Sequence, residues 1–149
     1  MKREIIAQGV EMHVLIPQRP PIVMVDKFYG VAGNSSYSGL TVTSDNIFCQ
    51  DGNFQEAGII EFIAQSAAAR IGYIYIQKKE PVLLGFIGSV DKMKIYNLPS
   101  IGAELEAEIT VIQEVADITL IEACVKVANC TIATCRMKIF LNKDGKETK

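Results

Sequence analysis

The chain of 149 residues has the length of one domain, and a domain of this size buries roughly two thirds of the surface that its unfolded chain exposes. Hydrophobic residues make up 49% of it and charged residues 21%, which excludes an intrinsically disordered protein. Fifteen basic and seventeen acidic residues give a net charge of −2. This balance argues against a nucleic-acid-binding protein, because such proteins usually carry a basic face.

We expect neither a secretory signal nor a transmembrane helix. The N-terminal stretch has acidic residues within its apolar part and lacks a small-residue cleavage site. The longest apolar region, residues 57–76, contains Glu61, Gln65 and Arg70. Each charge inside a membrane span costs roughly 3 kcal/mol at the bilayer centre. We therefore expect a cytoplasmic protein that has no membrane partner.

The cysteines do not indicate a metal site. They are Cys49, Cys124, Cys130 and Cys135, and no two of them form a CxxC pair. The chain also has a single histidine, so we expect no zinc and no other cofactor. Small reduced thiols are the simplest interpretation, although a disulfide between the strands that contain Cys124 and Cys135 stays open.

Two strands are expected before the first helix. Residues 22–28 (IVMVDKF) form a short apolar run that is typical of a buried or half-buried strand. Glycine, asparagine and serine at 30–35 then indicate a turn. Residues 36–44 alternate between two faces and predict a second strand, and the polar residues of 45–53 predict a loop.

Residues 56–77 predict one long helix with apolar side chains over nearly its whole circumference. The segment contains no proline, and Pro81 prevents the helix from continuing. A helix that is apolar all round must be enclosed by other elements. We therefore expect this helix to form the core.

Beyond Pro81 the polarity of the chain alternates with a period of two, as in β-strands. Because the links between the alternating segments are short, we expect antiparallel neighbours. Leu105, Ala107 and Ile109 alternate with glutamates, which predicts a sheet with one buried face and one solvated face. The four predicted strands are 83–96, 104–115, 118–127 and 131–141.

These elements predict an α+β fold in which a curved antiparallel sheet wraps around one long central helix. Two strands, the core helix and a four-stranded meander follow one another along the chain. No internal repeat or low-complexity tract suggests another organisation. Residues 1–149 are expected to form this single domain, with 142–149 as a frayed tail.

Three segments resemble those of the 3-hydroxyacyl-(acyl-carrier-protein) dehydratases of the FabZ type, which have the hotdog fold. Residues 15–28 (LIPQRPPIVMVDKF) resemble the family segment LLPHRYPFLLVDRV. Residues 58–68 (GIIEFIAQSAA) resemble the helix segment GVLILEALAQAA, and residues 84–109 resemble the stretch from F-A-G-I-D to P-G-D-x-L. The three segments occur in the same order over residues 14–141, which implies a hotdog fold for this chain.

The chain departs from this family at the histidines. The family has G-H-F-P-G before the helix, and its histidine is the catalytic base, whereas residues 48–58 here read FCQDGNFQEAG. A second family histidine, in the P-H-R turn, is replaced by Gln18. The shortened F-x-x-D-G loop is similar to that of dehydratase-like proteins from aryl-polyene pigment clusters, a divergent branch of the same superfamily.

The dehydration of a 3-hydroxyacyl thioester sets three requirements. The carbonyl must be polarised, a base must remove the C2 proton, and an acid must protonate the leaving hydroxyl. Free N–H groups at a helix N-terminus can polarise a carbonyl, and Gly58 would let its backbone approach a ligand closely. Glu61 lies in the first helical turn and matches the family's catalytic acidic residue, so we predict that it acts as acid or base. The alternative is that Glu61 caps the helix or anchors the preceding loop.

The catalytic base is the missing group. Asp51 could orient a water molecule, and Asn53 could hydrogen-bond to substrate, in the space that the family histidine leaves. Both residues also suit a plain turn. His13 lies far from that loop in the sequence, where a packing role suits it better. Gln65, one turn beyond Glu61, resembles the family's helix glutamine and is expected to hold the loop in place in the substrate-binding site.

Three functions stay open from the sequence. The chain is a dehydratase or dehydratase-like subunit of fatty-acid, polyketide or aryl-polyene synthesis, a hotdog thioesterase that uses Glu61 with Asp51, or a subunit that binds acyl groups without converting them. The resemblance implies an acyl-carrier-protein or CoA thioester as ligand, and a homodimer or a heterodimer with a histidine-bearing hotdog relative. Basic residues that could guide an acidic carrier protein are Lys78, Lys79, Lys92 and Lys94.

Overall fold

The computed structural model describes residues 3–81 and 85–141. The predicted tail at 142–149 lies outside the described residues. In chain order, the described elements are β1 (Ala7–Gln8), the 3-10 helix η1 (Gly9–Val14), β2 (Lys27–Ala32), β3 (Ser35–Thr41), β4 (Cys49–Gln50), β5 (Asn53–Phe54), α1 (Glu56–Gln77), β6 (Gly85–Ile95), β7 (Glu104–Val115), β8 (Ile118–Val127) and β9 (Cys130–Leu141).

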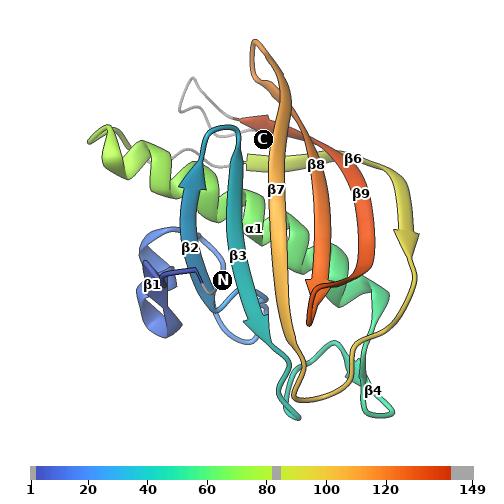
Figure 1. Ribbon diagram of the computed structural model, residues 1–149. Coiled ribbons are helices and arrows are strands. Elements are labelled where there is room, and N and C mark those ends of the chain that lie inside the picture. Colours follow the sequence, from blue (N-terminus) through green and yellow to red (C-terminus); the bar gives the residue numbers. More distant parts are fainter. Residues whose placement is uncertain (1–2, 82–84, 142–149) are drawn as a thin grey trace.

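Seven strands form one antiparallel sheet that curves around α1 (Figure 1). Their order in the sheet is β1-β2-β3-β7-β8-β9-β6. The strands β4 and β5 form a separate hairpin just before the N-terminus of α1. The predicted α+β fold, a curved antiparallel sheet around one central helix, is therefore confirmed.

The helix α1 has the predicted bounds and forms the core. Phe62 and Ile63 are fully buried on it, beneath the sheet. By length and composition α1 could also cross a membrane, but the sheet wraps around it, as expected of a core helix. Gly72 lies against the backbone of Leu15, and a Cβ atom on Gly72 would clash with the Leu15 carbonyl group. This contact brings the segment before β2 directly onto the helix.

The predicted strand at 22–28 is wrong. β2 begins only at Lys27, and residues 22–26 lie against α1, where Met24 and Val25 are buried. The N–H group of Met24 bonds to a side chain of α1 and not to a neighbouring strand. A short apolar run can be a buried strand or another buried segment, and periodicity alone does not distinguish the two.

The predicted meander is wrong in one connection. β7, β8 and β9 are antiparallel neighbours joined by short turns, as predicted. β6 pairs with β9 and not with β7, so residues 96–103 cross the ends of β8 and β9. Three strand spacings span about 14 Å, and a segment of this length reaches that far when extended. The link is therefore too long to specify which strands are neighbours.

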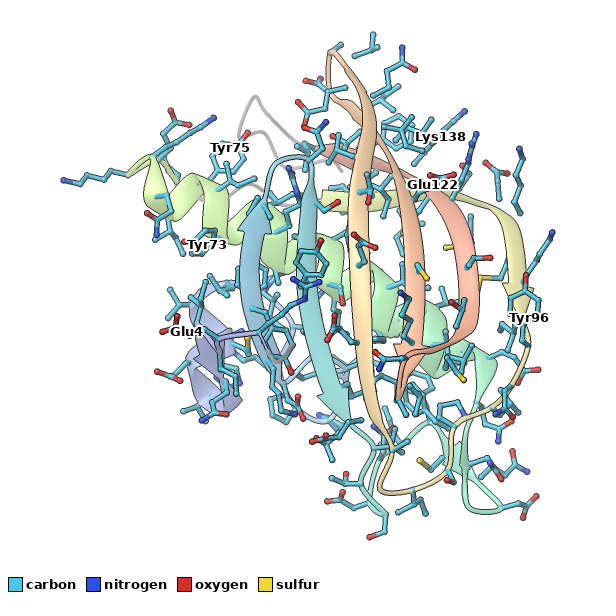
Figure 2. The ribbon with its side chains drawn as sticks, in the orientation of Figure 1. Glu4, Tyr73, Tyr75, Tyr96, Glu122 and Lys138 are labelled. Atoms are coloured by element: carbon cyan, nitrogen blue, oxygen red, sulfur yellow. The ribbon has the colours of Figure 1, made fainter. Side chains whose placement is uncertain are left out.

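The outer face of the sheet is polar, as the alternation in the sequence predicts. Leu105, Ala107 and Ile109 are buried against α1, while the residues between them point outward. Figure 2 shows Glu122 and Lys138 on the same outer face, on β8 and β9. The apolar face of the sheet is therefore the face that packs on α1.

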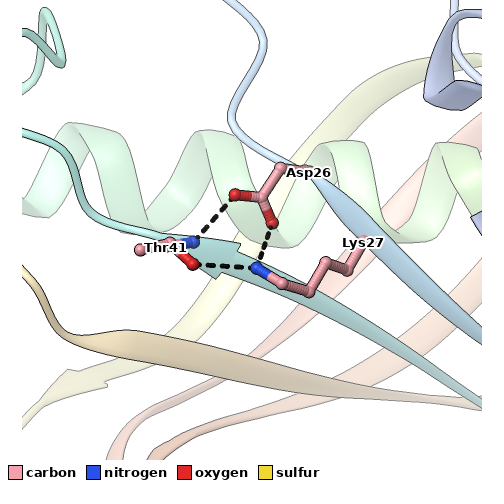
Figure 3. Close-up of polar contacts among 3 residues, drawn as sticks. All are labelled: Asp26, Lys27 and Thr41. Atoms are coloured by element: carbon pink, nitrogen blue, oxygen red, sulfur yellow. Dashed lines mark hydrogen bonds and ion pairs between the residues drawn. The ribbon is translucent and has the colours of Figure 1, made fainter. Parts of the chain in front are cut away.

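Asp26 links the start of β2 to the end of β3 (Figure 3). Its carboxylate accepts hydrogen bonds from Nζ of Lys27 at 2.9 Å and from the N–H group of Thr41 at 3.0 Å. Nζ of Lys27 also donates to Oγ1 of Thr41 at 2.8 Å. Partly exposed ion pairs usually contribute no more than about 1 kcal/mol. The main effect of the cluster is geometric, because it fixes where residues 22–26 leave the sheet for the helix.

The four cysteines are free thiols. Cys124 pairs in register with Thr134, so the following residue, Cys135, points to the opposite face of the sheet. The disulfide that the sequence left open between Cys124 and Cys135 is therefore absent. Burial raises the pKa of the Cys135 thiol to about 11, so this thiol stays protonated at neutral pH.

Gly72→Ala should destabilise the protein by about 2 kcal/mol or more, because the new methyl group meets the Leu15 backbone. In a helix interior the same substitution usually stabilises by about 1 kcal/mol, so the sign of the change is informative. Urea denaturation of both proteins measures it. Ala57→Gly is the control, because this residue is exposed on the same helix and the change measures only the ordinary helix preference of alanine over glycine, about 1 kcal/mol. A Gly72→Ala variant more stable than the wild type would contradict this packing.

Candidate active site

A cavity of about 250 Å³ opens beside α1. One face of the helix forms a wall, and the segment before β2, the start of β6 and the end of β9 form the others. Where the structure describes the chain, the lining is apolar except for two polar side chains, Gln18 and Glu61. The apolar lining includes Leu15, Pro17, Ala64, Ala68, Ile71 and Ile139.

Glu61 reaches this cavity from the second turn of α1, and not from the first turn where it was predicted, because the helix begins at Glu56. The residue is half-buried, and its Oε1 accepts a hydrogen bond of 2.9 Å from Nε2 of Gln65. Within the described part of the chain, no donor bonds to the other carboxylate oxygen of Glu61. The carboxyl group is therefore oriented by one hydrogen bond and leaves one oxygen for a ligand. It does not cap the helix or anchor the loop before it.

Gln65 connects Glu61 to the segment before β2, and not to the loop before the helix that it was predicted to hold. Its side chain is fully buried. Oε1 accepts a hydrogen bond of 2.6 Å from the Met24 N–H group, and Nε2 donates to the Ile22 carbonyl oxygen at 2.8 Å as well as to Glu61. Both N–H groups of Gln65 are therefore used within the protein, and a contact with substrate stays a prediction.

The N-terminus of α1 has no side-chain cap. Gln55 precedes the helix in an extended conformation, and its side chain bonds to the carbonyl oxygens of Gln50 and Asn53 and not to the first turn. Uncapped N–H groups carry partial positive charge, which suits the polarisation of a carbonyl. Gly58 lies in this turn, where Phe48 and Phe54 occupy the space that a side chain would need. Packing thus accounts for the glycine, and its contact with a ligand stays a prediction.

The structure does not bring Asp51 and Asn53 to the cavity that Glu61 lines. Asp51 is exposed in the turn between β4 and β5, with the left-handed φ of 54°. Nδ2 of Asn53 donates a hydrogen bond of 3.0 Å to the Leu98 carbonyl oxygen. Neither residue is among those that line the cavity. Their geometry is that of a turn and its anchor, the alternative that the sequence had left open.

His13, the single histidine of the chain, also lies outside the cavity lining. It is half-buried near the end of η1, and its carbonyl oxygen accepts a hydrogen bond from Arg19. The cavity therefore has a carboxyl group but no imidazole from this chain.

Sequence reasoning missed one polar group of the site. Gln18 was noted only as the residue that replaces a family histidine, yet its side chain lines the same cavity as Glu61. The available signal was its position in the LIPQRP turn, the first of the segments that carry the resemblance.

A family model described as ApeP dehydratase matches residues 10–149. The chain belongs to the ApeP-like dehydratase family. The predicted membership of a dehydratase-like hotdog branch is thereby confirmed, whereas the FabZ type is not. A search of curated protein sequences found no match.

Solved structures show the same fold for this ApeP-like chain. A chain of "The Dehydratase Heterocomplex ApeI:P from Xenorhabdus doucetiae" is similar with a TM-score of 0.82 and 20% identity, over 89% of this chain and 92% of that chain. A hypothetical thioesterase from Streptococcus pneumoniae, solved with coenzyme A, has a TM-score of 0.61 and 8% identity, over 77% and 84%. The PaaI protein of Escherichia coli has a TM-score of 0.59 and 11% identity, over 76% and 80%. The hotdog fold is thus shared with proteins described both as dehydratases and as thioesterases.

Gln65→Glu places a second carboxyl group in contact with Glu61. Two carboxylates this close do not both ionise, so one retains its proton and its folded-state pKa lies above its unfolded value. A raised pKa stabilises the fold below the unfolded pKa, and that stability is lost as pH rises through the folded pKa. We therefore expect the Tm of Gln65→Glu to fall, relative to the wild type, between about pH 4 and pH 8.

Thermal unfolding across this pH range measures the difference. Gln50→Glu, at an exposed position on β4, is the matched control and should follow the wild-type curve. A Gln65→Glu curve parallel to that of the wild type would show that the two side chains are not in contact.

Proposed function

We propose that this chain is a dehydratase-like subunit that acts on 3-hydroxyacyl thioesters carried by acyl carrier protein or CoA, in a synthesis of the fatty-acid, polyketide or aryl-polyene type. The observation that carries the proposal is Glu61, whose carboxyl group has one free oxygen at the wall of an apolar cavity. An acyl chain suits the apolar lining, and the carboxyl group suits proton transfer to the leaving hydroxyl. The family match supports the same reaction.

In this proposal Glu61 is the general acid. A base removes the C2 proton, the C2–H electron pair forms the C2=C3 double bond, and the C3–O bond breaks. The departing oxygen takes the proton of Glu61 and leaves as water. The uncapped N–H groups at the start of α1 would polarise the thioester carbonyl while charge develops on its oxygen.

The base is proposed to come from a second hotdog subunit that bears the family histidine. This chain has no imidazole at its cavity, and no other described base lines it. A similar chain occurs in a dehydratase heterocomplex, which supports an assembly of two different subunits. A complex of this kind would divide the acid and the base between its chains.

β6 is the edge at which we place this partner. Among the described strands it pairs only with β9, so its other edge is free to accept a strand. Gly85, Phe86 and Ile87 at the start of β6 also line the cavity. Phe86 and Ile87 are each 46% exposed, which is high for large apolar side chains. A strand added here would bring partner residues next to the cavity and cover this apolar surface.

A thioesterase is the second candidate, because a hypothetical thioesterase shares the fold. A single helix carboxylate with a water molecule can hydrolyse a thioester, so Glu61 alone would suffice. Asp51, its expected companion, is not at the cavity, and the family match favours dehydration. Release of free thiol from an acyl thioester would identify hydrolysis, whereas an enoyl product identifies dehydration.

Glu61→Gln should lower the dehydration rate of the complex by about 100-fold or more, because the amide cannot donate a carboxyl proton. The assay follows enoyl product from a 3-hydroxyacyl-carrier-protein with this chain and its histidine-bearing partner. Glu56→Gln is the matched control, since Glu56 is exposed in the first turn of the same helix and should leave the rate unchanged. An unchanged rate in Glu61→Gln would contradict the proposal and would indicate that the chain is a non-catalytic, acyl-binding subunit.

A further inference from the structure

The amide oxygen of Gln18 is a buried acceptor without a hydrogen-bond partner. Among the described residues, only four side chains have a buried polar atom in this condition, and Gln18 is the one that lines the cavity of Glu61. Buried polar atoms in folded proteins are nearly always paired, because the loss of water is otherwise uncompensated. An unpaired acceptor at the wall of a cavity is therefore suited to a donor from a ligand.

Two sets of contacts fix the backbone around Gln18, the hydrogen bonds of Arg19 and the packing of Leu15 on α1. Arg19 donates from Nη1 to the carbonyl oxygens of Ile16 and Gln18, each at 2.8 Å, and from Nη2 to that of His13 at 3.0 Å. In addition, the carbonyl group of Leu15 packs against Gly72 of α1. Gln18 is thus positioned before a ligand arrives, and its binding costs little reordering of the turn.

A hydroxyl group matches the two polar side chains of the cavity. A hydroxyl donates one hydrogen bond and accepts others, whereas an ether, a ketone or a methylene group cannot do both. We propose that Gln18 recognises the C3 hydroxyl of a 3-hydroxyacyl thioester, accepting its hydrogen while protonated Glu61 donates to its oxygen. This assignment rests on the proposed function. It makes Gln18 a specificity-determining residue that itself takes no part in bond breaking.

Recognition of the hydroxyl by Gln18 would distinguish the substrate from related acyl groups. The enoyl product and a saturated acyl chain have no hydroxyl, so they would leave the Gln18 oxygen buried and unpaired. Both should bind more weakly than the 3-hydroxyacyl form. The same contact would favour release of the product once water has left.

The test uses two ligands that differ only in the hydroxyl. They are the amide analogues of 3-hydroxyhexanoyl-pantetheine and of hexanoyl-pantetheine, in which the C2 proton is too weakly acidic to be removed. Isothermal titration calorimetry with the complex of this chain and its proposed histidine-bearing partner measures both affinities. We expect the wild type to prefer the hydroxylated ligand by about 10-fold, and Gln18→Met to reduce this preference to about 2-fold or less.

Two controls separate ligand recognition from a structural role. Gln113→Met, at an exposed position on β7, should keep the wild-type preference. Because Oε1 of Gln18 has no hydrogen-bond partner among residues 3–81 and 85–141, Gln18→Met should unfold at the same temperature as the wild type or higher. A residue that only supported the fold would give a lower Tm and an unchanged preference.

Equal affinity of the wild type for the two ligands, or an unchanged preference in Gln18→Met, would overturn the assignment of Gln18. Failure of the wild type to bind either ligand would overturn it too. The proposed function is judged separately, by the enoyl product of the complex, so Gln18 can fail while dehydration through Glu61 stands.

Discussion

The side chain of Gln65 joins two of the parts that form the site, the core helix and the segment before β2. Its amide bonds to the backbone of Ile22 and Met24, and from the same nitrogen to Glu61, while its backbone lies in the core helix. A fully buried amide with these partners is costly to disturb, because loss of one partner leaves the others uncompensated. The segment before β2 is thereby held on the helix, and the carboxyl group of Glu61 is turned to the cavity. The close contact between Gly72 and Leu15, about two turns further along α1, holds the same segment on the helix.

The sequence was sufficient where a local pattern determines structure. α1 agrees with its predicted bounds because an apolar circumference and Pro81 together specify a core helix and its limit. β7 and β8 agree because alternation reports a sheet with one buried face. Local patterns failed where long-range contacts decide. The apolar run at 22–26 is covered by the helix and not by a strand, and β6 lies beside β9 through a link that no turn rule constrains.

In the candidate site, too, local patterns predicted some residues, whereas long-range contacts determine the others. Glu61 and Gln65 could be predicted together because four residues along a helix place side chains on one face, and the structure joins them. Asp51 was chosen for its nearness in sequence to the missing family histidine, but the hairpin of β4 and β5 keeps it exposed. Gln18 could not be predicted as a neighbour of Glu61, since only the packed segment before β2 brings the two to one cavity. The structure thus contains a carboxyl group and an unpaired amide, but no imidazole, around an apolar space.

Among the described residues the cavity therefore has an acid but no imidazole base, and it borders the free edge of β6. The most direct test is a crystal structure of the chain with the proposed histidine-bearing hotdog partner. The account predicts that β6 pairs with a strand of the partner and that the partner's imidazole lines one continuous cavity with Glu61. A complex that assembles through another surface, with β6 uncovered and the imidazole remote from Glu61, would contradict it.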